Sequence, residues 1–161
     1  MEAYLVEKDN ELYVAKITKS LPEYWFSQIV KEYPHEYINR VHETGVIDKV
    51  NHIYLIIRDY KHLIQYIPDK LFDLVIKAKE SSSNIDKYRG TLKDKTSLYQ
   101  FDELLKRTKV LEEYYGFSID TSSGNWGEDE KGRMILIDID GNVPNINKLR
   151  DNMKNRHSSI H

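Results

Sequence analysis

The longest amphipathic pattern in the chain covers residues 98–115 and predicts a long helix. Apolar and aromatic residues recur there every three or four positions, which is the spacing of one buried helix face. That face consists of Leu98, Phe101, Leu104, Leu105, Thr108, Leu111 and Tyr115. Gly116 follows directly and is the residue type that most often ends a helix. We therefore expect the strongest helix of the fold at this point.

Strand-forming segments lie mainly in the first sixty residues. Residues 4–8 and 12–17 are rich in Tyr, Leu and Val, and they flank Asp9-Asn10. Asp and Asn tolerate the positive φ of a tight turn, so this pattern predicts a β-hairpin. Residues 53–57 form an almost continuous β-branched run, which predicts a strand buried on both faces.

Three further segments are helical in pattern. Ser20-Leu-Pro-Glu23 is a capping box with proline in the first turn, and Pro34 should end or bend the helix that begins there. Its apolar stripe consists of Trp25, Phe26, Ile29, Val30 and Tyr33. A further turn or two of helix is expected around residues 37–41, closed by Gly45. Another helix is expected over residues 69–80.

The remaining segments complete an α+β order. Residues 81–97 contain turn residues and mixed charge and are expected to form an exposed loop or linker. Short strands are expected near 126–128 and 133–138, around a turn at 129–132. The chain from Asn142 onward is polar and basic and is expected to be a solvated tail. Strands come early and helices dominate later, which favours an α+β fold over a doubly wound parallel sheet.

Composition excludes several classes of function. The chain has 161 residues, a formal net charge of -2, and no cysteine. It therefore suits a single domain without disulfides or thiolate chemistry, and its charge gives no general attraction to nucleic acid. A basic start followed by an apolar run is missing, as is any run of ~20 apolar residues, so we expect a cytoplasmic protein without a membrane span.

Asp120, Asn125 and Asp138 are the residues whose pattern is chemically most specific. A loop and a short hairpin could bring one proton acceptor and two oxygen ligands together beside a magnesium-bound phosphate. Structural roles remain open for each: an Asx turn at Asp120, a hairpin signal at Gly124-Asn125, and a solvated carboxylate at Asp138.

On these residues the chain resembles the protein-kinase-like superfamily, including its aminoglycoside-phosphotransferase branch. In that family an Asp-x-x-x-x-Asn loop follows a long helix, and a small hairpin then delivers a metal-binding Asp. Asp120-Thr-Ser-Ser-Gly-Asn125 has that spacing, and Asp138 lies thirteen residues beyond Asn125. The resemblance makes residues 98–115 the family's long support helix.

The resemblance extends to the N-terminal part. Tyr13-Val-Ala-Lys16-Ile17 resembles the strand whose Lys binds the nucleotide phosphates, and Glu32 or Glu36 on the next helix would pair with that Lys. Glu32 is favoured because Pro34 lies between the two. Asp59 and Tyr60 would form the hinge whose backbone groups receive adenine.

The resemblance implies a compact kinase-like domain over residues 1–141, followed by a basic tail over 142–161. Residues 1–60 would be a reduced N-lobe, a small antiparallel sheet with one helix, and 61–141 a truncated, mainly helical C-lobe. It also implies ATP and Mg²⁺ as cofactors. Asp120 would accept the proton of the attacking hydroxyl, Asn125 and Asp138 would hold Mg²⁺, and Asp140 would add a second carboxylate.

The chain also departs from the family pattern. It contains no Gly-x-Gly-x-x-Gly, and Ser118-Ile119 stand where the family has His-Arg. Ile139-Asp140 replace the usual Phe-Gly, and only about twenty residues follow. From this pattern we expect the activation segment and the helices that bind peptide substrates to be absent.

Two functions of different class follow from this pattern. One is an Mg²⁺-dependent transfer of the ATP γ-phosphate to a hydroxyl of a protein or small molecule. The other is a catalytically silent, kinase-like module that docks on a partner protein and inhibits it, as a phage or mobile-element counter-defence factor would. A third reading is an α+β domain whose similarity to kinases is accidental.

Overall fold

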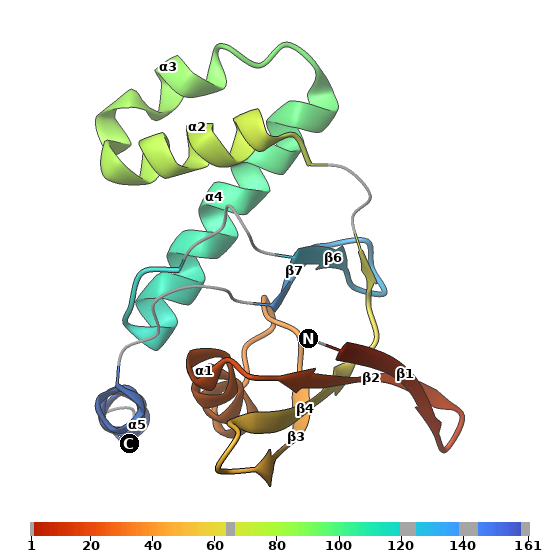
Figure 1. Ribbon diagram of the computed structural model, residues 1–161. Coiled ribbons are helices and arrows are strands. Elements are labelled where there is room, and N and C mark those ends of the chain that lie inside the picture. The colour runs from red at the N-terminus through yellow and green to blue at the C-terminus, as the bar shows by residue number, and fades with distance from the viewer. Residues whose placement is uncertain (1, 64–66, 120–124, 139–144, 159–161) are drawn as a thin grey trace.

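A four-stranded antiparallel sheet forms the N-terminal half of the protein (Figure 1). The computed structural model describes residues 2–63, 67–119, 125–138 and 145–158. The sheet has the order β1-β2-β4-β3. Its strands are β1 Glu2–Lys8, β2 Glu11–Thr18, β3 Val41–Asp48 and β4 Ile53–Asp59. Asp9 and Asn10 both have positive φ between β1 and β2, which confirms the predicted hairpin.

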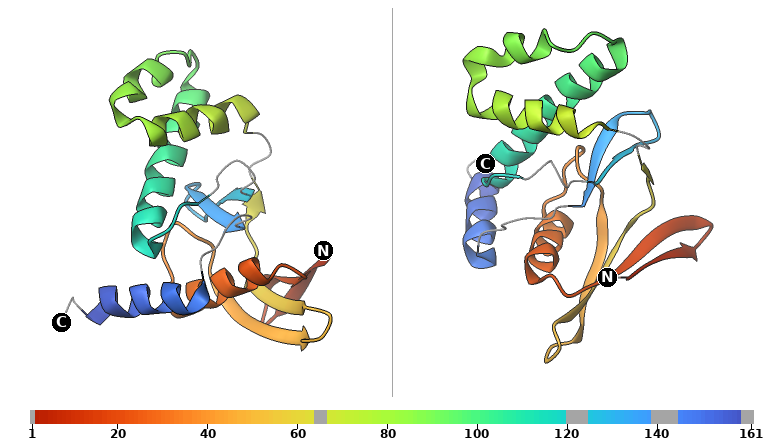
Figure 2. Two further views of the ribbon diagram at one scale, coloured as in Figure 1. Left: turned by 60° about the vertical axis from the view of Figure 1, so that its left-hand side comes forward. Right: turned by 45° about the horizontal axis from the view of Figure 1, so that its top comes forward.

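Helix α1, Leu21–Glu32, covers one face of this sheet (Figure 2). The Ser20 hydroxyl accepts a hydrogen bond from the Glu23 amide at 3.3 Å, which confirms the predicted helix start. The prediction that β4 is buried on both faces was wrong, because its residues alternate between buried and half-buried. The reason is that α1 packs against only one side of the sheet.

The segment after α1 is a strand, and the prediction of further helical turns there was wrong. β3 pairs with β4 along the edge of the sheet, with register breaks near each end. Ile38 and Val41, whose spacing suggested a helix, are both buried. Tertiary contacts therefore account for their apolar character, because Ile38 bridges to Leu136 and Val41 pairs with Arg58.

Helices dominate the C-terminal half, as predicted. α2 spans Asp69–Glu80 and packs against α4, Lys95–Tyr115, which begins three residues earlier than its apolar pattern suggested. Gly116 ends α4 with φ 81°, in agreement with the predicted helix stop. The connection expected to be a loop contains the 3₁₀ turn η1, Ser82–Asn84, and the short helix α3, Ile85–Arg89.

A second, three-stranded sheet and a last helix complete the α+β fold. The sheet has the order β5-β6-β7, with β5 His62–Leu63, β6 Asn125–Glu128 and β7 Met134–Asp138. α5, Ile146–Ser158, lies in the segment predicted to be a solvated tail. Its Ile146, Leu149 and Met153 are buried, so this segment belongs to the hydrophobic core. No helix of the described segments is long and apolar enough to cross a membrane.

Candidate active site between the two sheets

Lys16 is a buried lysine held by an ion pair. It lies on the α1-facing side of β2 and is only 6% exposed. Its Nζ is 2.6 Å from Oε2 of Glu23, which is also buried. Because Ser20 starts α1 two residues after β2 ends, Glu23 in the first helical turn reaches back to the lysine. The Ser20 cap therefore also positions the partner of Lys16.

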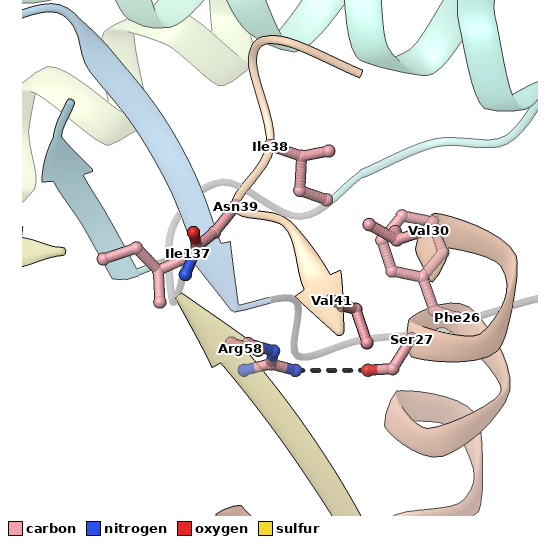
Figure 3. A pocket seen from close by; sticks show the side chains of 8 residues that line it. All are labelled: Phe26, Ser27, Val30, Ile38, Asn39, Val41, Arg58 and Ile137. Carbon is pink, nitrogen blue, oxygen red and sulfur yellow. Dashed lines mark hydrogen bonds between the residues drawn. The ribbon is translucent and has the colours of Figure 1, made fainter. Parts of the chain in front are cut away.

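Asp138, the last residue of β7, meets this pair from the second sheet. Its Oδ2 lies 3.5 Å from Lys16 Nζ, and its Oδ1 contacts the Arg58 guanidinium. Arg58 is buried at the end of β4 and also donates to the Ser27 hydroxyl at 3.2 Å. Figure 3 shows this bond from β4 to α1. Strands from both sheets thus converge on one point.

Lys16, Glu23, Arg58 and Asp138 form what we call the buried charge cluster. Two positive and two negative groups make it formally neutral. Taking an unpaired charge out of water costs several kcal/mol, so mutual pairing is what permits this burial. Each member consequently depends on the others for its place in the interior.

Residues 37–39 fix the second sheet against the first. The Asn39 amide donates to the Leu136 carbonyl at 2.7 Å, and the Leu136 amide donates to the Tyr37 carbonyl at 2.9 Å. The Asn39 side chain donates to the Asp59 carbonyl at 2.8 Å. One short segment is therefore bonded to both β7 and β4, which holds Asp138 close to Lys16 and Arg58.

A small cavity adjoins the charge cluster (Figure 3). Its volume is about 10 Å³, which is close to the space of a single water molecule. Its polar lining residues are Ser27, Asn39 and Arg58. This cavity is far too small for a nucleotide, so a nucleotide would have to approach Lys16 and Asp138 from elsewhere.

The acid that orients Lys16 is Glu23, and the predicted pairing with Glu32 was wrong. Glu32 lies in the last turn of α1, is about half exposed, and has Arg150 of α5 at 3.5 Å. Glu36, the other candidate, is exposed beyond the end of the helix. The helix runs away from β2, so only its first turn can reach a side chain on that strand.

The predicted hinge residues are engaged within the protein. The Asp59 amide donates to the Arg40 carbonyl at 3.1 Å, and the Tyr60 amide donates to the Leu12 carbonyl at 3.3 Å. The Asp59 carboxylate also contacts His42. An adenine at this strand end would have to compete with these bonds, and its binding there stays a prediction.

Of the predicted Asp/Asn/Asp set, the structure brings Asn125 and Asp138 together. They are partners in the β6–β7 ladder. Cα atoms of such partners lie ~4.5–5.5 Å apart, so the backbones of the two residues are neighbours. Asp120 and Asp140 lie outside the described residues, and their predicted roles stay predictions.

A half-buried ion pair that the sequence did not reveal holds the residue that precedes Asp120. Lys79 of α2 and Glu112 of α4 lie 3.0 Å apart. Glu112 Oε2 accepts from the Ile119 amide at 2.8 Å, and Lys79 Nζ donates to the Ile119 carbonyl at 3.2 Å. Both backbone groups of Ile119 are therefore fixed by this pair.

Replacing Glu112 with alanine is expected to lower the free energy of unfolding by about 2 kcal/mol, because it removes the counter-ion of Lys79 and the acceptor of the Ile119 amide. The matched control is Asp102→Ala, which removes an exposed ion pair with Arg89 from the same helix. The control should change stability little. Urea unfolding of the two variants measures both effects, and equal losses would contradict the role given to Glu112.

Two members of the charge cluster were also missed. The sequence pattern of Glu23 is that of a capping box, but a carboxylate two residues inside a helix start can also pair with a cation on a neighbouring strand. Arg58 is the first charged residue after the apolar run of β4, on the same side as Tyr54 and Ile56. A charge in register with buried positions is a signal that pairing must compensate its burial.

The donor set fits a magnesium–phosphate group in kind. The Asp138 carboxylate offers hard oxygen ligands, and Lys16 offers a cation for phosphate. Arg58 is a competing cation on Asp138. Among residues 2–63, 67–119, 125–138 and 145–158, no three His, Asp or Glu side chains are grouped to hold a metal ion.

Comparison with known proteins gives structural matches alone. No protein-family model and no curated protein matches the chain. The apo form of a thermostable mutant of aminoglycoside phosphotransferase APH(4)-Ia is similar over 98% of this chain and 75% of its own, with 11% identity and a TM-score of 0.40. Its ternary complex with AMP-PNP and hygromycin B has a TM-score of 0.39 at the same identity and coverage. At this distance the likeness concerns the arrangement of elements and says nothing about the chemistry of the site.

Proposed function

We propose that the chain is a compact kinase-like phosphotransferase that moves the γ-phosphate of ATP to a hydroxyl group. The observation that carries the proposal is the convergence of Lys16, Glu23 and Asp138 from a strand, the following helix and a distant hairpin. A lysine oriented by a helical glutamate beside a metal-binding aspartate is the arrangement that positions nucleotide phosphates in kinase-like enzymes.

Each residue has a role in this proposal. Lys16, held by Glu23, would bind the phosphates, and Asn125 and Asp138 would hold Mg²⁺ with Asp140. Bound Mg²⁺ neutralises charge on the phosphates during transfer. Asp120 would accept the proton of the attacking hydroxyl, and the Lys79–Glu112 pair fixes the residue before it. The acceptor is a protein or a small molecule.

The test is transfer of labelled phosphate from ATP with Mg²⁺, to the protein itself or to small hydroxyl compounds. Transfer should be lost in an Asp120→Ala, Asp138→Ala double variant and kept in Glu128→Gln, an exposed carboxylate on the same hairpin. Thermal unfolding with ATP and Mg²⁺, against ATP with chelator, should show stabilisation of about 2.7 kcal/mol at a hundredfold excess over Kd. If the parent transferred no more phosphate than the double variant, the enzymatic role would be refuted.

A catalytically silent docking module is the second candidate, and the contact of Arg58 with Asp138 favours it. A permanent cation on that carboxylate would take the place of a metal. The bonds that already occupy the Asp59 and Tyr60 backbone point the same way. This candidate predicts no Mg²⁺-dependent shift, and a protein partner that binds the parent and the double variant equally well.

A further inference from the structure

β1 is an exposed edge strand of the four-stranded sheet. All seven of its residues are exposed, and it pairs with β2 alone among the described strands. Tyr4, Leu5 and Val6 at its centre are 50%, 62% and 41% exposed. Figure 2 shows the β1–β2 hairpin projecting beyond α1. The edge therefore presents apolar side chains and one row of backbone groups to the surroundings.

The two edges of the sheet differ in how they are protected. β3, at the other edge, has register breaks between Val41 and Glu43 and between Val46 and Asp48. Such irregularities, central charges and prolines keep sheet edges from pairing with other strands. β1 pairs with β2 without a break over its whole length, and its three central residues are uncharged. It is therefore the edge that is open to another strand.

The hairpin turn determines which backbone groups of β1 face outward. In a two-residue hairpin the residues that flank the turn, here Lys8 and Glu11, exchange both hydrogen bonds, and the pairs then alternate. Ala3, Leu5 and Glu7 consequently direct their amide and carbonyl groups away from β2. These residues form the bonding row of the free edge.

We propose that β1 pairs antiparallel with β1 of a second copy of this chain, with Leu5 opposite Leu5, to form one continuous sheet. In this register Ala3 lies opposite Glu7 of the second copy, so the outward bonding rows match. Glu2 lies opposite Lys8 and Tyr4 opposite Val6. Each unlike pair occurs twice because the contact has twofold symmetry.

Charge and shape favour this register over its neighbours. Pairs that do not exchange hydrogen bonds have closer side chains, and these are the Glu2–Lys8 and Tyr4–Val6 pairs, which share one sheet face. Opposite charges and aromatic–β-branched pairs stabilise cross-strand neighbours. A shift by one pair would place Glu2 opposite Val6, or Lys8 opposite Tyr4, and would lose both charge pairs.

The first experiment is sedimentation of the parent and of charge variants over a range of concentrations. The parent should form a dimer. Lys8→Glu should weaken it roughly tenfold, because two attractive pairs become repulsive. Adding Glu2→Lys to that variant should restore the parent's dimer affinity. A parent that stays monomeric, or a double variant no better than Lys8→Glu, would overturn the proposal.

Cross-linking tests the register independently, since the chain has no cysteine of its own. Leu5→Cys should oxidise to a covalent dimer, because hydrogen-bonded partners have Cα atoms ~5.5 Å apart, within disulfide range. In an Ala3→Cys dimer each cysteine lies opposite Glu7 of the other copy. The two cysteines are then four residues apart along the strands, roughly 13 Å, and should not cross-link. Val46→Cys on β3 controls for random collision. Equal cross-linking at all three positions would exclude the register.

Discussion

Replacing Glu23 with glutamine is expected to lower the free energy of unfolding by about 3 kcal/mol. Removing one partner of a buried ion pair leaves the other charge in the interior, at a cost of roughly 3–5 kcal/mol. Within the part of the chain that the structure describes, Lys16 would keep Asp138 as its only acidic partner, which lies 3.5 Å away and is shared with Arg58. The low end of that range follows from this remaining contact.

Glu32→Gln is the matched control, since it makes the same change in the same helix. Glu32 is about half exposed, and its 3.5 Å pair with Arg150 should contribute at most about 1 kcal/mol. Denaturant unfolding of both variants gives the comparison directly. If Glu32→Gln destabilised the protein as much as Glu23→Gln, the assignment of Glu23 as the partner of Lys16 would be wrong.

The comparison also separates a structural from a functional role. If Lys16 binds phosphates, its orientation by Glu23 should matter for nucleotide binding more than for folding alone. The Mg²⁺·ATP-dependent stabilisation should then be reduced in Glu23→Gln and unchanged in Glu32→Gln. A loss of stability with an unchanged nucleotide response would make Glu23 a structural counter-ion only.

Local patterns in the sequence were sufficient for most of the fold. The capping box at Ser20, the positive-φ turn at Asp9-Asn10 and the glycine after α4 each encode their element within a few residues. β3 could not be predicted this way, because its apolar residues are explained by contacts with distant strands. α5 was not predicted because it has only three residues in the hydrophobic core among many polar ones, which is too few for a visible apolar stripe.

The site was predictable only in part for the same reason. The sequence singled out Lys16 and Asp138, and the structure brings them within ion-pair distance. It could not show that Arg58 joins them, since no spacing rule links a residue of β4 to the end of β7. The predicted partner of Lys16 was wrong because an acid reaches β2 only from the first turn of α1, where Glu23 lies, and Glu32 is in the last turn.

Arg58→Met is expected to destabilise the protein by about 3 kcal/mol and to make its stability depend on divalent cations. The cluster would change from neutral to a net charge of one negative unit, because Asp138 would lose its contact with Arg58 and keep the 3.5 Å contact with Lys16. A carboxylate relieved of a competing cation is a better oxygen ligand for Mg²⁺. Millimolar Mg²⁺ should therefore recover part of the lost stability, as measured by thermal unfolding with and without chelator.

An additional Asp138→Asn change provides the decisive control. The Arg58→Met, Asp138→Asn variant has a neutral cluster again, since only Lys16 and Glu23 remain charged. It should be more stable than Arg58→Met and should show no response to Mg²⁺. Arg133→Met, at an exposed pair with Asp129 in the β6–β7 turn, should change neither property. A double variant less stable than the single one would show that Arg58 does not neutralise Asp138.

The Mg²⁺ response of the parent then decides between the two proposed functions. A phosphotransferase must bind Mg²⁺ with its nucleotide while Arg58 is present, so the parent should be stabilised by ATP only when Mg²⁺ is available. A docking module uses Arg58 in place of the metal. Stabilisation by Mg²⁺ should then be seen in Arg58→Met and not in the parent. Comparing the parent with Arg58→Met thus shows whether Mg²⁺ can bind at Asp138 while Arg58 is present, or whether Arg58 permanently occupies the metal's place.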